Sequence, residues 1–167
     1  RYLRPEADTP VIQVSMPHNL DAESSILGGI LLRNEVLTHL DTLEVDDFYD
    51  MRHKIVFAAI RALEAMARPI DVVTVENEIE KAGKLDAVGG VAFLGELALR
   101  VPTADNVEAY ARLVVDYRIC RDVMLKLSDV VESGYIGGKS GEALIHDANQ
   151  ALMTIRTGQE APVRTMN

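Results

Sequence analysis

Apolar residues recur along most of this chain at intervals of three and four positions, which is the period of an α-helix. Alternation with a period of two, typical of a half-buried strand, is scarce. The first periodic segment predicts a helix at about 21–32, with Asn34 close to its end and either Asp21 or Asn19 as its N-cap. The pattern therefore predicts an all-α fold.

Shorter helices are expected in the next seventy positions, where glycine and proline interrupt the pattern. We expect these pieces to pack into one compact multi-helix globule, residues 16–103. They cover about 35–42, then 51–66 with Met66 in an apolar stripe, then a segment capped by Asp71 or Thr74 that stops at Gly83, and a last one from Gly89-Gly90 to near Pro102.

The following stretch differs, because residues 104–133 contain neither proline nor glycine. They predict a helical rod about 45 Å long at 1.5 Å per residue, with Thr103 as its cap. A turn from Gly134 to Gly141 then leads to a second helix at about 142–156. Two antiparallel helices joined in this way form a long helical hairpin, residues 104–157.

Apolar residues in both hairpin helices alternate steps of four and three, the spacing of a coiled-coil seam. A lone hairpin cannot bury its inner seam and its flanks together, so apolar surface is expected to remain for a partner. Alternatively, residues off the seam such as Ile119, Val123 and Val130 pack back on the globule, and periodicity alone leaves both alternatives open. The candidates for hairpin packing and for the oligomer interface are Leu113, Tyr117, Cys120, Met124 and Leu127, continued by Val131, and Leu144, Ala148, Leu152 and Ile155, with Ala151 beside them.

Composition narrows the possible functions. Seventeen basic and 26 acidic residues give a formal net charge of −9, which argues against this chain as the main grip on nucleic acid. No stretch approaches the roughly 20 apolar residues of a membrane span, and the start lacks a signal-peptide pattern, so we expect a soluble, cytoplasmic protein. The single cysteine, Cys120, has no partner for a disulfide or a zinc site and is expected to be a small buried residue.

The two ends of the sequence lose the helical pattern and contain prolines. Residues 1–15 are expected to form a flexible arm. Residues 158–167 are expected to begin a linker to a further domain.

The segment Gly137 to Ser140 reads GGKS and ends like a phosphate-binding P-loop. That motif also requires a glycine five residues before Gly138, where this chain has Ser133, and a strand before the loop, where we predict the long helix. We interpret the segment as a turn between helices, with Ser140 as a cap.

Other candidates for catalysis or metal binding are weak. The four histidines show neither the HExxH spacing of zinc sites nor the Glu-x-x-His pairs of di-iron bundles, and no GxSxG elbow occurs. We therefore predict no catalytic, cofactor-binding or metal-ligating residue. His53 is expected at a packed or exposed helix start, and a solvated acidic face is expected for Asp41, Glu44, Asp46, Asp47 and Asp50.

Four signatures follow one another in the first two thirds of the chain. They read MPHNLDAESSILGGILL at 16–32, DDFYDMRHKIVFAAI at 46–60, RPIDVVTVENEIEKAGKLDAVGGVAFLGEL at 68–97 and VPTADNVEAY at 101–110. This series resembles the N-terminal domain of bacterial DnaB-type replicative DNA helicases, over about 16–156. The positions that match the globule of that family, and that the resemblance implies carry its fold, are Phe48, Tyr49, Ile70, Leu85, Gly89, Gly90, Phe93 and Leu97.

The resemblance implies a globule carrying a long hairpin, here Asp105 to Arg156. Hairpins of this family pair into dimers, and three dimers form a collar on a hexameric ring that surrounds DNA and docks a DnaG-type primase and, in some bacteria, a helicase loader. A RecA-like motor domain would follow Asn167, bind ATP and magnesium, and move along single-stranded DNA, so this chain alone would be non-catalytic. Two alternatives remain: a stand-alone helical interaction adaptor without a motor, and a nucleotide-binding enzyme that uses the Gly137 to Ser140 segment.

Overall fold

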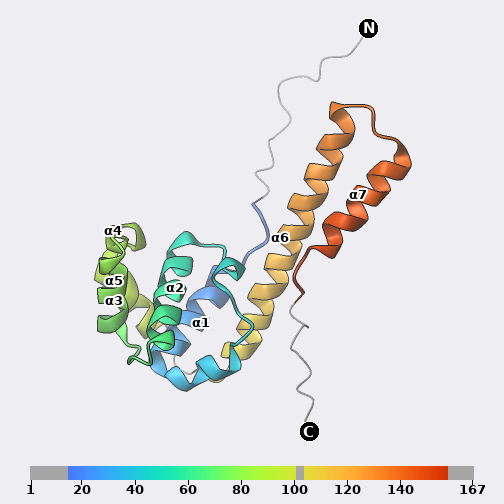
Figure 1. Cartoon of the computed structure of the whole chain (residues 1–167). Helices are drawn as coiled ribbons and strands as arrows, with labels where there is room; N and C mark the ends of the chain where they lie inside the picture. The colour runs from blue at the N-terminus through green and yellow to red at the C-terminus, as the bar shows by residue number, and fades with distance from the viewer. Residues whose placement is uncertain (1–14, 101–103, 158–167) are drawn as a thin grey trace, which may run out of the picture.

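The computed structural model describes residues 15–100 and 104–157. In these ranges the chain forms helices and no strand, which confirms the all-α prediction, and a two-helix hairpin extends from a cluster of shorter helices (Figure 1). The arm and the linker fall largely outside the described residues, as does Thr103. The elements are α1 (Leu20–Leu32), the 3-10 helices η1 (Asn34–His39) and η2 (Val45–Asp47), α2 (Met51–Ala65), α3 (Val72–Lys81), α4 (Leu85–Val88), α5 (Gly90–Leu99), α6 (Val107–Ile136) and α7 (Gly141–Met153).

Helix α1 lies at the centre of the globule, where it packs against α2, α5 and the first half of α6. Its apolar side chains Ile26, Leu27 and Ile30 are fully buried. Burying one such side chain contributes about 1.5–3 kcal/mol, so this helix is a main source of the stability of the globule. Of the positions that match the family signatures, Phe48, Ile70 and Leu97 are buried in the core, but Tyr49 is 40% exposed and stacks on His18.

The start of α1 differs from one of the two predictions. Asn19, not Asp21, is the N-cap, because its extended backbone brings the side-chain oxygen to 2.9 Å from the amide of Ala22. Asp21 lies in the first turn, where its negative charge suits the helix dipole. The short helix expected at 35–42 is a 3-10 helix that ends at His39.

Helices α2 and α3 begin and end close to the predicted positions. Met66 follows the end of α2 and is 46% exposed, so the prediction that it continues the apolar stripe is wrong. Asp71 and Thr74 both act at the start of α3, because each side chain bonds the backbone amide of the other residue in a capping box. Gly83 follows α3 with a φ of 67°, a left-handed conformation that glycine adopts without strain.

The long helix starts three residues later than expected, at Val107, with Asn106 as an N-cap that makes no side-chain capping bond. Ala104 and Val107 are instead buried against α1. A Cβ placed on Gly29 of α1 would overlap the Cγ2 of Val107, so the glycine allows the close approach. Close packing against α1 therefore fixes where the long helix begins.

The turn between the hairpin helices is also shorter than predicted. Helix α6 continues through Gly134 to Ile136. Gly134 has no side chain, which leaves room for α7, because an added Cβ would lie 3.3 Å from both methyl groups of Leu144. The chain turns at Gly137 and Gly138, which both have positive φ, and Ser140 caps α7 by accepting from the amide of Ala143. The interpretation of the GGKS segment as a turn is confirmed.

Candidate interaction surface of the helical hairpin

Helix α6 presents three different faces along its length. The first lies against the globule and follows a regular series of four- and three-residue steps. Its first three members are apolar and its last two are arginines, and all five are buried: Val107, Ala111, Val114, Arg118 and Arg121. The globule therefore covers one side of the first half of α6 (Figure 1).

The second face lies against α7. Gly134 marks it, because it contacts Leu144, and the half-buried residues Val130, Leu127 and Val123 continue it toward the globule with the same helical spacing. Two of the three residues expected to pack back on the globule therefore share the face of Gly134, whereas the third, Ile119, lines a groove beside Leu40 and Leu43. On α7 the half-buried apolar residues are Ala143, Leu144, Ala148 and Ala151, and the half-buried Ile155 follows just after the helix.

The third face lies between the other two, and neither the globule nor α7 covers it. Cys120 is exposed there, so the prediction that it is buried is wrong, because the stripe that contains it points away from both neighbours. Tyr117 is half-buried. The large side chains that remain exposed on this face are Leu113 (36%), Met124 (44%), Val131 (57%) and, one turn beyond the predicted seam, Tyr135 (86%). We name this row, from Leu113 to Tyr135, the α6 stripe.

The nine predicted interface residues thus divide into three groups. Four of them lie on the inner side of the hairpin: Leu127 on α6, Leu144 and Ala148 on α7, and Ile155 just after α7. Leu152 is 41% exposed and lies seven residues from Ile145, which is 65% exposed, so these two share the outer edge of α7. The other four, Leu113, Tyr117, Cys120 and Met124, belong to the α6 stripe.

A buried polar cluster joins the hairpin to the globule. Asp47 at the end of η2 is completely buried, so its assignment to a solvated acidic face is wrong. Its carboxylate accepts hydrogen bonds from Arg118 Nε at 3.0 Å, from Arg156 Nη2 at 2.5 Å and from the amide of Glu44 at 2.7 Å. Arg121 donates to the Asp47 carbonyl. A buried carboxylate requires such partners, since an unpaired charge in this place would cost several kcal/mol.

The sequence contained a signal for this cluster that pattern reasoning missed. Arg118 and Arg121 occupy positions of the apolar series that runs through Ala111 and Val114. An arginine at a position that should be buried needs an acidic partner, and the acidic run before Phe48 offered one. Which carboxylate would meet these arginines depends on contacts between residues about seventy positions apart.

Lys139 of the GGKS segment bonds side chains of both hairpin helices. Its ammonium lies 2.6 Å from the carboxylate of Asp147 on α7 and 3.2 Å from the hydroxyl of Ser133. The hydrogen bond from Lys139 lowers the pKa of Asp147 below its ordinary value. The lysine therefore bridges the two helices at the turn.

A second buried cluster resembles a hydrolytic triad in its spacing only. His53 Nδ1 lies 2.8 Å from Glu23 Oε2, and its Nε2 lies 3.3 Å from the Ser24 hydroxyl. The serine is 2% exposed and donates to the carbonyl of Leu20, so it has neither access to a substrate nor a free proton to lose. Glu23 also accepts from the amides of Tyr49 and Asp50, and the cluster ties α1 to the start of α2.

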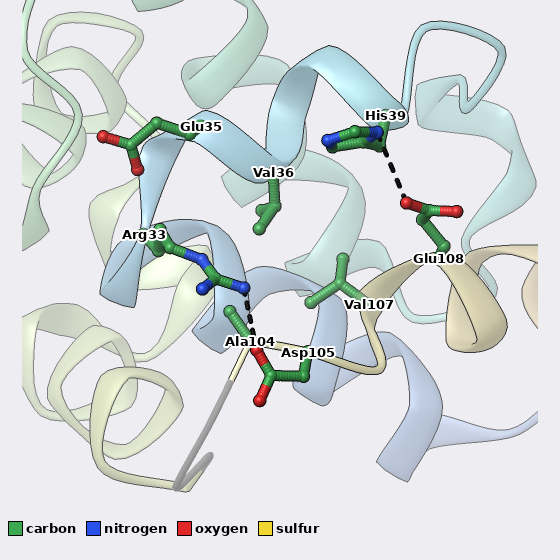
Figure 2. A pocket seen from close by; sticks show the side chains of 8 residues that line it. All are labelled: Arg33, Glu35, Val36, His39, Ala104, Asp105, Val107 and Glu108. Atoms are coloured by element: carbon green, nitrogen blue, oxygen red, sulfur yellow. Dashed lines mark hydrogen bonds and ion pairs between the residues drawn. The ribbon is translucent and has the colours of Figure 1, made fainter.

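Figure 2 shows a cleft between η1 and the start of α6. Two polar contacts span it, the ion pair of Arg33 with Asp105 at 3.0 Å and the contact of His39 with Glu108 at 3.3 Å, with Val36 between them. All four side chains are about half exposed or more, and such exposed contacts contribute at most about 1 kcal/mol each. The cleft therefore helps to hold the start of α6 and offers no enclosed site.

Within residues 15–100 and 104–157, no group of three or more histidine, cysteine, aspartate or glutamate side chains is arranged to hold a metal ion. Nor does any helix in these ranges have the length and apolar character needed to cross a membrane.

Comparison with known proteins identifies the family. Residues 15–116 match the model of the DnaB-like helicase N-terminal domain, which is more than half of the chain. The chain belongs to this family. Among curated members, it is 34% identical over 140 residues to the replicative DNA helicase DnaC of Bacillus subtilis and 32% identical over 171 residues to the replicative DNA helicase DnaB of Haemophilus influenzae. These alignments cover 83% and 96% of this chain, but only 31% and 36% of the relatives, so the chain spans about one third of their length.

Solved structures of DnaB-type proteins share the fold. The N-terminal domain of the Mycobacterium tuberculosis DnaB helicase superposes with a TM-score of 0.78 at 33% identity, over 84% of this chain and all of that one. A DnaB-like replicative helicase, solved in a study of its interactions with primase, superposes with a TM-score of 0.66 over 86% of this chain and 32% of that one. Its identity of 24% makes it a likeness of fold.

Proposed function

We propose that this chain is the N-terminal collar domain of a hexameric replicative DNA helicase, and that the α6 stripe is the surface on which two copies associate. The observation that carries the proposal is the row of apolar side chains on α6 that neither the globule nor α7 covers. Exposed apolar rows of this length on an otherwise charged protein are typical of protein interfaces. Membership in the DnaB-like family supports the same assignment.

The division of the chain follows from this proposal. Residues 16–103 form the globule, 104–157 the hairpin used for association, 1–15 an arm, and 158–167 the start of a linker to a RecA-like motor domain. Curated relatives about three times as long as this chain support a further domain. That domain would bind ATP and magnesium, use hydrolysis to move along single-stranded DNA, and separate the duplex.

The proposed assembly is a dimer formed through the hairpins, three of which make a trimer of dimers and close the hexamer. Such a collar would surround the DNA and dock a DnaG-type primase and, in some bacteria, a helicase loader. The primase partner is supported by the structural relative that was studied with primase. The net charge of −9 agrees with a collar that leaves the main grip on DNA to the motor. A helicase that unwinds a bacterial chromosome works in the cytoplasm, which is therefore the proposed location of this chain.

The mass of the purified chain across a concentration series tests the proposal. Size exclusion coupled to light scattering should give dimers or larger even-numbered assemblies that dissociate on dilution, since association depends on mass action. A strict monomer at high concentration would contradict the assignment of the α6 stripe as an interface.

A further inference from the structure

A residue that follows the second helix of the hairpin is bonded to the globule, and not only to the hairpin. Helix α7 packs on α6 (Figure 1). The chain then passes through Thr154 and Ile155 to Arg156, which contacts the globule. At Arg156 the contacts change from hairpin to globule, because this residue bonds groups in the segment from Thr42 to Asp47.

Arg156 is held by three groups of the globule and by α6. Its guanidinium donates to Asp47 at 2.5 Å and to the carbonyl of Thr42 at 3.1 Å, and it lies 3.4 Å from the carboxylate of Glu44. Its own carbonyl accepts from Arg118 Nη2 at 2.5 Å. Side chain and backbone of one residue are therefore both fixed, immediately before the described part of the chain ends at Thr157.

We propose that Asp47 and Arg156 form a latch that fixes the direction in which the chain leaves the hairpin, relative to the globule. The proposal goes beyond association of copies, because neither residue belongs to the α6 stripe. The latch acts within one chain, so it stands whether or not copies associate.

The chemistry of the cluster explains why Arg156 can act as a latch. Asp47 is shared by two guanidinium groups, and Arg118 and the Glu44 amide still satisfy its carboxylate when Arg156 is absent. Loss of Arg156 therefore leaves no unpaired buried charge, whereas loss of Asp47 would remove the carboxylate that Arg118 and Arg156 share. Arg156 itself is 35% exposed at the side chain, so it can leave its site without opening the core.

Distances between spin labels within one chain test the latch. Labels are placed on cysteines at Thr157 and at the exposed Glu80 of α3, in a Cys120→Ser background, and labelled chains are diluted with an excess of unlabelled chains so that only distances within a chain are measured. The labelled chain with Arg156 intact should give one narrow distance between the two labels. Arg156→Ala should lose that narrow distance and give a broad distribution. The matched control is Arg112→Ala, which removes an exposed ion pair with Glu108 on α6 and should keep the narrow distance.

The outcome separates a latch from a general structural role. A broad distribution in Arg156→Ala, with wild-type helicity and wild-type mass, supports the latch. A narrow distance in that variant overturns it, and so does a loss of helicity, because Arg156 would then hold the whole fold and not the exit of the chain.

Trypsin gives a second measurement that needs no label. The bond between Arg156 and Thr157 should resist cleavage, because the arginine side chain and its carbonyl are both engaged. Arg156→Lys keeps a trypsin site but loses the planar fork that reaches three acceptors, so cleavage at this bond should be faster than in the wild type. An unchanged cleavage rate would contradict the latch.

Discussion

A carboxylate placed at Met124 should separate associated copies while each chain stays folded. Met124 lies in the middle of the α6 stripe and is 44% exposed. Full burial of a methionine side chain contributes about 1.5–3 kcal/mol, so covering its exposed part would contribute about 1 kcal/mol. In a two-fold symmetric pair each chain supplies this residue, which gives about 2 kcal/mol for the dimer.

The Met124→Asp substitution removes this contribution and also forces a carboxylate into an apolar contact, which costs further free energy. Since each 1.4 kcal/mol changes the dissociation constant tenfold, we expect the constant to rise at least about 100-fold. Sedimentation equilibrium over a range of concentrations measures it. The free energy of unfolding of one chain should change by only about 0.5 kcal/mol, because the site is on the surface.

Met66→Asp is the matched control. The two methionines are similarly exposed, 46% against 44%, but Met66 follows α2 in the globule, away from the hairpin. The control should keep the wild-type dissociation constant. If Met124→Asp associates as tightly as the wild type while melting normally, the α6 stripe is not the contact and the reasoning fails.

Three further predictions test packing, charge and chemistry. Gly29→Ala should lower the free energy of unfolding by about 1–2 kcal/mol in urea denaturation, because its Cβ would overlap Val107, whereas Gly95→Ala on the open side of α5 should raise stability by about 0.5–1 kcal/mol; equal effects would show that the α1–α6 contact is not tight. The hydrogen bond from Arg52 lowers the pKa of Asp50 below 3.8, so this pair stabilises the fold above that pH and the effect is lost as the pH falls through the lowered pKa. Asp50→Asn keeps an N-cap acceptor but loses the ion pair with Arg52, so it should be less stable than the wild type at pH 7. The difference should shrink in denaturation curves taken at increasingly acid pH, and a constant difference would refute this. The chain alone should neither hydrolyse ATP nor bind it or single-stranded DNA tightly, and calorimetric titration showing sub-micromolar binding of either would contradict this.

The steps of four and three residues along α6 predicted its helical structure correctly, but they did not predict which of its faces is buried. The periodicity correctly predicted a long helix, a second helix and a turn between them. It could not tell which row of side chains meets which neighbour, because a helix of 30 residues carries several such rows and each one is compatible with burial. Cys120 was therefore expected inside, although its row is the exposed one.

The acidic run before Phe48 shows the same limit for polar residues. Asp46 and Asp47 are neighbours of identical type, and local sequence gives both the same expectation of exposure. Yet Asp47 is fully buried, while the side chain of Asp46 is 87% exposed. The difference arises because arginines from α6 and from the end of the hairpin meet at one of the two positions.

The amino-acid sequence by itself determined the all-α class, most of the helices, the cap at Ser140, and the resemblance to the DnaB N-terminal domain. It also narrowed the cap of α3 to Asp71 or Thr74. These features depend on residues a few positions apart or on the order of short signatures. Only the tertiary structure decided which face of α6 stays uncovered, where that helix begins and ends, and which carboxylate is buried. These properties depend on contacts such as Gly29 with Val107 and Asp47 with Arg156, about 80 and 110 positions apart, and the period of a single helix contains no information about such partners.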